Sequence, residues 1–360
     1  MDESKNIFIL RNALRNTTGI ANPRLYEDFK ELVSNIVEDS LTDEDMSYIL
    51  MNIFWKLEGN DISISADPAT FFLGTTTDYP LNFKVYNQKA GRIDSDPSSS
   101  TIFGYNANND LVNNNTVAIG YYAGRTINSP GNYNTIVGNW AAHRTNIMDS
   151  SVVIGYEAAS NLDTSLSNVI IGKNAGHGYE DEMGYDLQNS VIIGTDAGKE
   201  IIDAGGIVAI GHSAAKDFTG ITTAPIPGLN TSQSYGSVFI GKQAGESSTG
   251  TASAVIIGAQ AGKLNTDAHS NTLIGSAAGE NNFNENVGTY PNTAVGAGAL
   301  RGGETAPLTS YTVLEGTCNV GVGAGAGRLN KRGWGNTYVG YLSGYDHGNS
   351  DILTDAYSFA

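Results

Sequence analysis

Apolar and polar positions follow one short phrase that repeats along most of the chain after Thr116. The phrase runs small polar residue, Val or Thr, apolar residue, Ile or Val, Gly, two variable residues, Ala, and Gly or Ala. The Gly that closes the apolar run stands at Gly120, Gly138, Gly155, Gly172, Gly194, Gly211, Gly241, Gly258, Gly275, Gly296, Gly323 and Gly340, with a degenerate first copy at Gly104. Six of the intervals are 17 residues, and the others are mostly 17 plus an insertion. A fixed period with loop-sized insertions predicts a stack of repeats, none of which buries its apolar face alone.

Alternation within the phrase predicts a short β-strand. The residue before the Gly is Ile or Val, the residue two earlier is Val or Thr, and these two share one face because side chains alternate along a strand. The residue between them, such as Ile136 or Phe239, is usually apolar as well, so both faces require burial. A coil of about 17 residues encloses little volume. We therefore expect one face to fill the coil and the other to pack on a second copy of the chain.

Small residues mark the corner after the strand. The third residue after the Gly is Ala in every copy except Ser343, which fits a place where backbones approach closely, and the Gly fits a turn with positive φ. A phosphate-binding glycine loop requires a helix after the loop, whereas turn residues and another β phrase follow here. We interpret the repeat glycines as structural. Ice or crystal binding by a flat Thr ladder is disfavoured, because the Val/Thr column is mixed and is expected to face inward.

Four zones follow from these patterns. Residues 1–60 are predicted to be a helical attachment region, since Asn22-Pro23 is typical of a helix start and apolar residues then recur at spacings of three and four. Residues 61–112 form a β connector with a half-buried strand around Leu81 to Val85. Residues 113–345 form the solenoid shaft, and residues 346–360 form a short tail.

Composition agrees with a turn-rich β protein and excludes some classes of partner. The chain has 44 Gly and 9 Pro in 360 residues and only 16% charged residues. Its net charge of −17 argues against a nucleic-acid surface. The single Cys318 excludes an internal disulfide framework, no cofactor is implied, and no apolar run is long enough for a secretory signal or membrane insertion.

Two segments carry a family resemblance. The stretch with Leu73-Gly74-Thr75-Thr76, Leu81 to Val85 and Ala90 to Ile93, and repeats such as Asn134 to Gly138, resemble modules of bacteriophage tail and head fibres. In such fibres these modules commonly precede a self-cleaving chaperone domain. The repeat phrase is also similar to the head repeats of trimeric autotransporter adhesins, which form a parallel β-roll shared by three chains. The resemblance covers roughly residues 71–344 and implies a homotrimeric fibre.

The chain also departs from both families. Its repeat of 17 residues is longer than the shorter adhesin unit, so the handedness of the coil is not carried over. The residues of this sequence include no segment typical of a signal peptide or of the C-terminal membrane barrel that an autotransporter requires, and we expect no chaperone domain within the residues after Gly344. These departures favour a virion protein made in a host cytoplasm.

Catalytic and recognition residues are sparse in this sequence. A glycan-depolymerising spike would need two carboxylates across a sugar bond, and Glu180, Asp181 and Glu182 would supply them, but adjacent charges in one inserted loop usually mark a solvated turn. The scattered histidines would bind an ion only if stacked on a trimer axis, so no metal site is predicted. Receptor contacts are better placed on the two longest insertions, at Thr223, Asn230, Gln233, Tyr235 and Tyr311, because loops on a rigid scaffold carry binding.

The sequence thus predicts a mainly β, parallel β-solenoid fibre that is not an enzyme. Its partners are itself as a homotrimer, other virion proteins through the N-terminal region, and a host cell-surface glycan or protein. A purely structural decoration or assembly component of the capsid or tail is the main alternative, and a depolymerising tailspike is the second.

Overall fold

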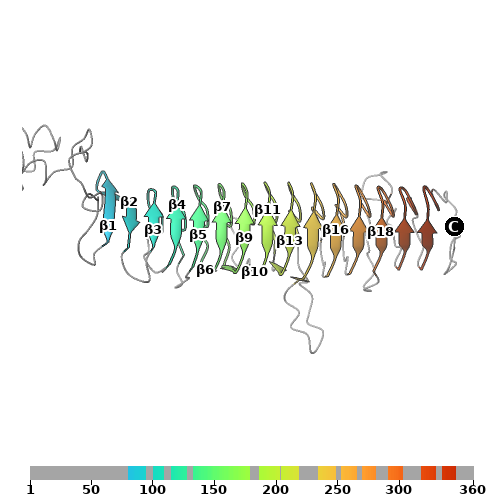
Figure 1. Ribbon diagram of the computed structural model, residues 1–360, viewed down its shortest axis with the longest axis horizontal. Helices are drawn as coiled ribbons and strands as arrows, with labels where there is room; N and C mark the ends of the chain where they lie inside the picture. Colours follow the sequence, from blue (N-terminus) through green and yellow to red (C-terminus); the bar gives the residue numbers. More distant parts are fainter. Residues whose placement is uncertain are drawn as a thin grey trace, which may run out of the picture. The chain divides into compact units, whose positions relative to one another are not determined.

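Figure 1 shows the protein as a computed structural model. The residues that the structure describes are 80–94, 100–108, 115–127, 133–178, 186–202, 204–218, 234–248, 253–265, 270–280, 291–302, 318–329 and 335–345. All of them belong to the compact unit Thr75–Ala360. The helices predicted within residues 1–60 and the tail 346–360 lie outside the described residues.

One long sheet, here sheet A, contains most of the strands. Its strands are hydrogen-bonded in the order β1 (Leu81–Val85), β2 (Gln88–Ile93), β3 (Thr101–Phe103), β4 (Val117–Ile119), β5 (Thr135–Val137), β7 (Val152–Ile154), β9 (Val169–Ile171), β11 (Val191–Ile193), β13 (Val208–Ile210), β15 (Val238–Ile240), β16 (Val255–Ile257), β17 (Thr272–Ile274), β18 (Thr293–Val295), β19 (Val320–Val322) and β20 (Thr337–Val339). From β3 onward the pairing is parallel, and equivalent residues of successive repeats face one another, for example Val191 and Val208. The repeats therefore stack as coils of a parallel β-solenoid (Figure 1).

The N-terminal end of sheet A is built differently. Strands β1 and β2 form an antiparallel hairpin, and β2 pairs antiparallel with β3. The strand expected around Leu81 to Val85 is β1, and the degenerate repeat at Gly104 follows β3, which already pairs as the first parallel strand. The hairpin thus covers the edge that β3 would otherwise expose.

A second, shorter sheet, here sheet B, forms another side of the coils. It contains β6 (Ile147–Asp149), β8 (Thr164–Leu166), β10 (Asp186–Gln188), β12 (Ala204–Gly205) and β14 (Ser234–Tyr235), paired in parallel in this order. These strands had no counterpart in the predictions, because their inward residues Met148, Ser165 and Leu187 share no residue type.

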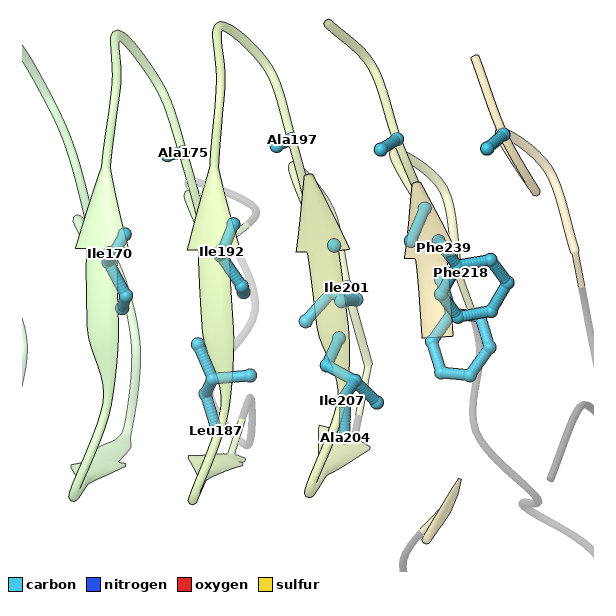
Figure 2. Packing of buried hydrophobic residues seen from close by; sticks show 14 of the residues in the cluster. Ile170, Ala175, Leu187, Ile192, Ala197, Ile201, Ala204, Ile207, Phe218 and Phe239 are labelled. Carbon is cyan, nitrogen blue, oxygen red and sulfur yellow. The ribbon is translucent and has the colours of Figure 1, made fainter. Parts of the chain in front are cut away.

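The core is a column of side chains inside the coils. The middle residue of each strand from β3 to β20 in sheet A points inward, as Ile170 and Ile192 do in Figure 2, and it is at most 1% exposed wherever it carries a side chain. The corner Ala residues, from Ala107 to Ala326, are all fully buried. Leu187, Ile201 and Phe218 fill the coil from other sides (Figure 2). Large and small side chains in the middle column compensate one another in volume. The large Phe239 pairs with Ala209 of β13, and its ring occupies the space that a side chain at Gly245 would need.

Candidate functional site

The outward face of sheet A repeats the same pattern of side chains from coil to coil. It consists of two columns, one of Val and Thr and one of Phe, Ile and Val, which flank the buried middle residue of every strand from β3 to β20. Both columns are half-buried or exposed, reaching 41% at Ile119 and 60% at Val339. We call these two columns the apolar strip.

The expectation that the Val/Thr column faces inward is therefore wrong. The middle position faces inward instead, because the space inside a narrow coil accepts one side chain from each sheet A strand together with the corner Ala. The column is still mixed in composition, so the argument against a flat Thr ladder rests on that mixture alone.

The repeat glycines lie where each strand turns into the corner. From Gly104 to Gly340 their φ angles are +123° to +142°, which L-residues rarely adopt. At Gly194 an added Cβ would lie 2.5 Å from the carbonyl oxygen of Gly211 in the next coil. Turns rather than helices follow these glycines throughout the described ranges, so the arrangement differs from a phosphate-binding loop.

The predicted receptor positions fall almost entirely outside the described residues. This holds for Thr223, Asn230, Gln233 and Tyr311, and for the carboxylates Glu180 to Glu182. The backbone of Tyr235 ends strand β14 in sheet B. The structure brings none of these residues together in the part that it describes.

An aromatic cluster that the sequence analysis missed lies on the first coils. The rings of Tyr105 and Tyr121 lie 5.6 Å apart between centroids and nearly parallel, at 12°. Tyr122 meets Tyr121 at 4.1 Å and Trp140 edge-on at 5.0 Å. We use the name aromatic cluster for Tyr105, Tyr121, Tyr122 and Trp140. All four occupy the two variable positions after a repeat Gly, so coil stacking brings together residues that are distant in sequence.

Charged and polar groups border the aromatic cluster. The guanidinium of Arg125 lies 4.2 Å from the Tyr122 ring centroid, and the Tyr121 backbone N–H donates to Asn139 Oδ1 at 3.0 Å. The side-chain hydrogen bond between Tyr121 and Tyr122 raises the pKa of Tyr121 and lowers that of Tyr122. His143 packs edge-on against Trp140 at 4.4 Å and is 7% exposed.

Burial lowers the pKa of His143 to about 4, and the charges of Arg144 and Arg125 add to this effect against an opposing contribution from Glu157. Its unfolded pKa is about 6.5. Folding stability attributable to neutral His143 is thus present above pH 6.5 and is lost as the pH falls toward 4, because only the unfolded chain binds the proton in that interval.

We expect the free energy of unfolding to fall by about 1–3 kcal/mol between pH 7 and pH 4 through this residue. Urea unfolding followed by tryptophan fluorescence measures it. His143→Ser, the residue that the next coil has at Ser160, should flatten the pH dependence in this interval. An equally steep fall in the variant would assign the acid sensitivity to other groups.

Within the described ranges, His, Cys, Asp and Glu side chains nowhere form a group of three or more that would hold a metal ion. His143, His177 and His212 are described, whereas His269 and His347 are not. None of the described segments forms a helix suited to spanning a bilayer.

No known family, curated protein or solved structure matches this chain significantly.

Proposed function

We propose that this chain is a non-enzymatic structural protein of a virion, which forms a homotrimeric fibre. Its N-terminal region attaches to the particle, and its shaft and loops are available for adhesion to the host surface. The single observation that carries the proposal is the apolar strip.

The apolar strip favours association between copies of the chain. Contiguous apolar patches of more than a few hundred Å² are rare on soluble monomers and usually mark contacts with a partner. The strip repeats the same two columns from β3 to β20, so an identical strip on another copy is complementary to it coil by coil. Three copies agree with the resemblance to trimeric fibres and adhesin heads.

A trimeric shaft would act mechanically and multivalently. Three parallel copies present every weak contact three times, and linked contacts raise the overall avidity without any new interaction. The excess of negative charge keeps such an assembly soluble and disfavours nucleic acid as a partner. The adhesive and the purely decorative roles share this architecture and differ in what the loops contact.

The mass of the full chain in solution tests the association. We expect light scattering to give three times the mass of one chain. Ile193→Lys combined with Ile257→Lys places two charges in the apolar strip and should weaken association at least tenfold, because an unpaired Lys is costly to bury. Thr195→Lys combined with Ala259→Lys is the matched control, since these exposed residues lie two positions further along the same coils. A single-chain mass for the unmodified protein would contradict the proposal.

Binding to cells separates the two roles. Labelled protein should adhere to some strains in a panel of bacteria if the fibre is adhesive. Adhesion to none of them, together with binding to fibre-depleted phage particles, would favour the decorative role.

A further inference from the structure

We infer that the aromatic cluster on the first coils is a binding platform for the pyranose rings of a neutral glycan. The inference rests on the proposed function, in that it names the ligand class of an adhesive fibre. It concerns other residues than those of the insertion loops.

The rings of the aromatic cluster are not required by the fold. The same two positions after the repeat Gly are occupied by Lys173 and Asn174 in one coil and by Thr195 and Asp196 in another. The backbone is unchanged in those coils. The backbone N–H of Trp140 donates to the backbone carbonyl of Tyr121 at 2.8 Å, and the equivalent backbone N–H of Asp196 donates to the carbonyl of Lys173 at 2.9 Å. Side chains much smaller than an indole therefore satisfy the corner.

Two residues of the aromatic cluster have a left-handed backbone conformation. Tyr122 and Trp140 have φ of 58° and 60°, a left-handed region in which bulky residues are uncommon. Every described coil has a similar φ at this position, for example Glu157 at 53° and Gln243 at 58°, so the conformation belongs to the repeat corner. Tyr122 and Trp140 are the two aromatic residues among the repeats at this position, so the corner itself does not require a ring.

The exposed surface of the cluster has the chemistry that a sugar ring requires. Tyr105 and Tyr121 are 41% and 40% exposed and lie nearly parallel, so they present aromatic surface to the solvent. The negative π face attracts the weakly positive C–H groups on the apolar face of a pyranose. Phenol hydroxyls, the Arg125 guanidinium and the Asn139 amide lie at the border, and the Asn139 amino group is not needed for the bond that its Oδ1 accepts. Sugar hydroxyls find hydrogen-bonding partners there.

The charge of the chain and the periodicity of the coils refine the ligand class. A net charge of −17 disfavours a polyanionic ligand through long-range repulsion, so a neutral glycan is the better partner. Tyr105, Tyr121 and Trp140 come from three successive coils. An extended oligosaccharide is therefore able to contact more than one ring, and individually weak contacts combine.

The experiment is isothermal titration calorimetry on the full chain with maltohexaose, cellohexaose and linear mannohexaose. We expect at least one of them to bind with a Kd of about 1 mM or tighter. Tyr122→Asn combined with Trp140→Asn should weaken that binding at least tenfold. Asn fits the left-handed corner, as Asn174 shows, so this variant should remain folded. The control is Tyr341→Ala, which removes an exposed Tyr from the first position after Gly340, the position that Tyr105 and Tyr121 occupy in the first coils. It should bind like the unmodified protein.

Several results would overturn the inference. These are no binding to any of the three oligosaccharides, equal binding by the double Asn variant, or binding only of an acidic probe such as a hyaluronan hexasaccharide. Light scattering on the same samples separates this inference from the proposed function. A single-chain mass with glycan binding intact contradicts the trimer alone, whereas a trimer without glycan binding contradicts the inference alone. Dissociation of the double Asn variant would show that the rings contact another copy, which also overturns it.

Discussion

Replacing Gly194 by Ala should destabilise the protein by about 3 kcal/mol or more, because the added methyl group would meet backbone atoms of the next coil. Gly194 has a φ of +138°, and an added Cβ would lie 2.5 Å and 2.7 Å from the carbonyl oxygen and carbon of Gly211. These are backbone atoms of the next coil, so no side-chain rotation relieves the clash. Chemical unfolding followed by circular dichroism measures the loss.

Gly340→Ala is the matched control for Gly194→Ala. Gly340 has a similar φ of +123°, but the nearest heavy atom to an added Cβ is the Ser343 Cβ at 4.0 Å. The free energy of unfolding of this variant should fall only by the cost of placing Ala at a positive φ, about 1–2 kcal/mol. Equal losses in both variants would show that φ alone, and not close coil stacking, requires glycine in this column. Because each coil contacts mainly its neighbours, Gly194→Ala should also increase protease cleavage near the disturbed coils.

The stacking of coils was predictable because three columns repeat in the sequence. The recurring Gly, the Ala three residues later and the apolar run before the Gly together require a strand followed by a tight corner at a fixed period. The structure confirms a parallel β-solenoid with a spacing of about 17 residues. The corner Ala residues, from Ala107 in the first coil to Ala326, are all fully buried. This agrees with the close approach of backbones that the small residue at this position indicated.

Alternation did not predict which face of each strand points into the coil. It shows which positions share a face, but not which face is buried. The more uniform Val/Thr and Ile/Val columns resemble a core, yet they face outward. The interior tolerates residues as different as Ala209 and Phe239 because neighbouring coils compensate in volume. Outer columns gain from uniformity instead, since equivalent residues stack directly on one another in the parallel ladder.

The aromatic cluster escaped detection for a related reason. Tyr105, Tyr121 and Trp140 are separated by a full coil in sequence and become neighbours only when the coils are stacked. The signal lies in the two variable positions after each Gly, where the residue types differ from coil to coil and carry no shared pattern. Scanning those two columns down the stack would have found the run of rings.

A second large effect is expected at the buried ladder of polar side chains that precedes the strands of sheet A. Asn168 is 1% exposed, and its Nδ2 donates to Leu187 O at 2.7 Å and to Ser165 Oγ at 3.1 Å. Its Oδ1 accepts from the Ser190 N–H of the next coil at 2.9 Å. One side chain thus links sheet B to the start of a strand in sheet A.

Asn168→Ala should cost about 2–4 kcal/mol of unfolding free energy, because it leaves the buried Ser190 N–H and Leu187 carbonyl without this partner. Asn168→Ser should cost markedly less, about 1 kcal/mol. A Ser at this position already accepts the next backbone N–H elsewhere in the ladder, as Ser190 Oγ does for Ile207 N–H at 3.2 Å. Urea unfolding of the three proteins under identical conditions gives the comparison.

If Asn168→Ala and Asn168→Ser cost the same, the bond to the next coil does not contribute, and the loss belongs to the Nδ2 contacts with sheet B. If Ser restores most of the stability, the backbone N–H of each following coil depends on an acceptor from the coil before it, and this dependence explains why Asn, Ser and Thr dominate the column.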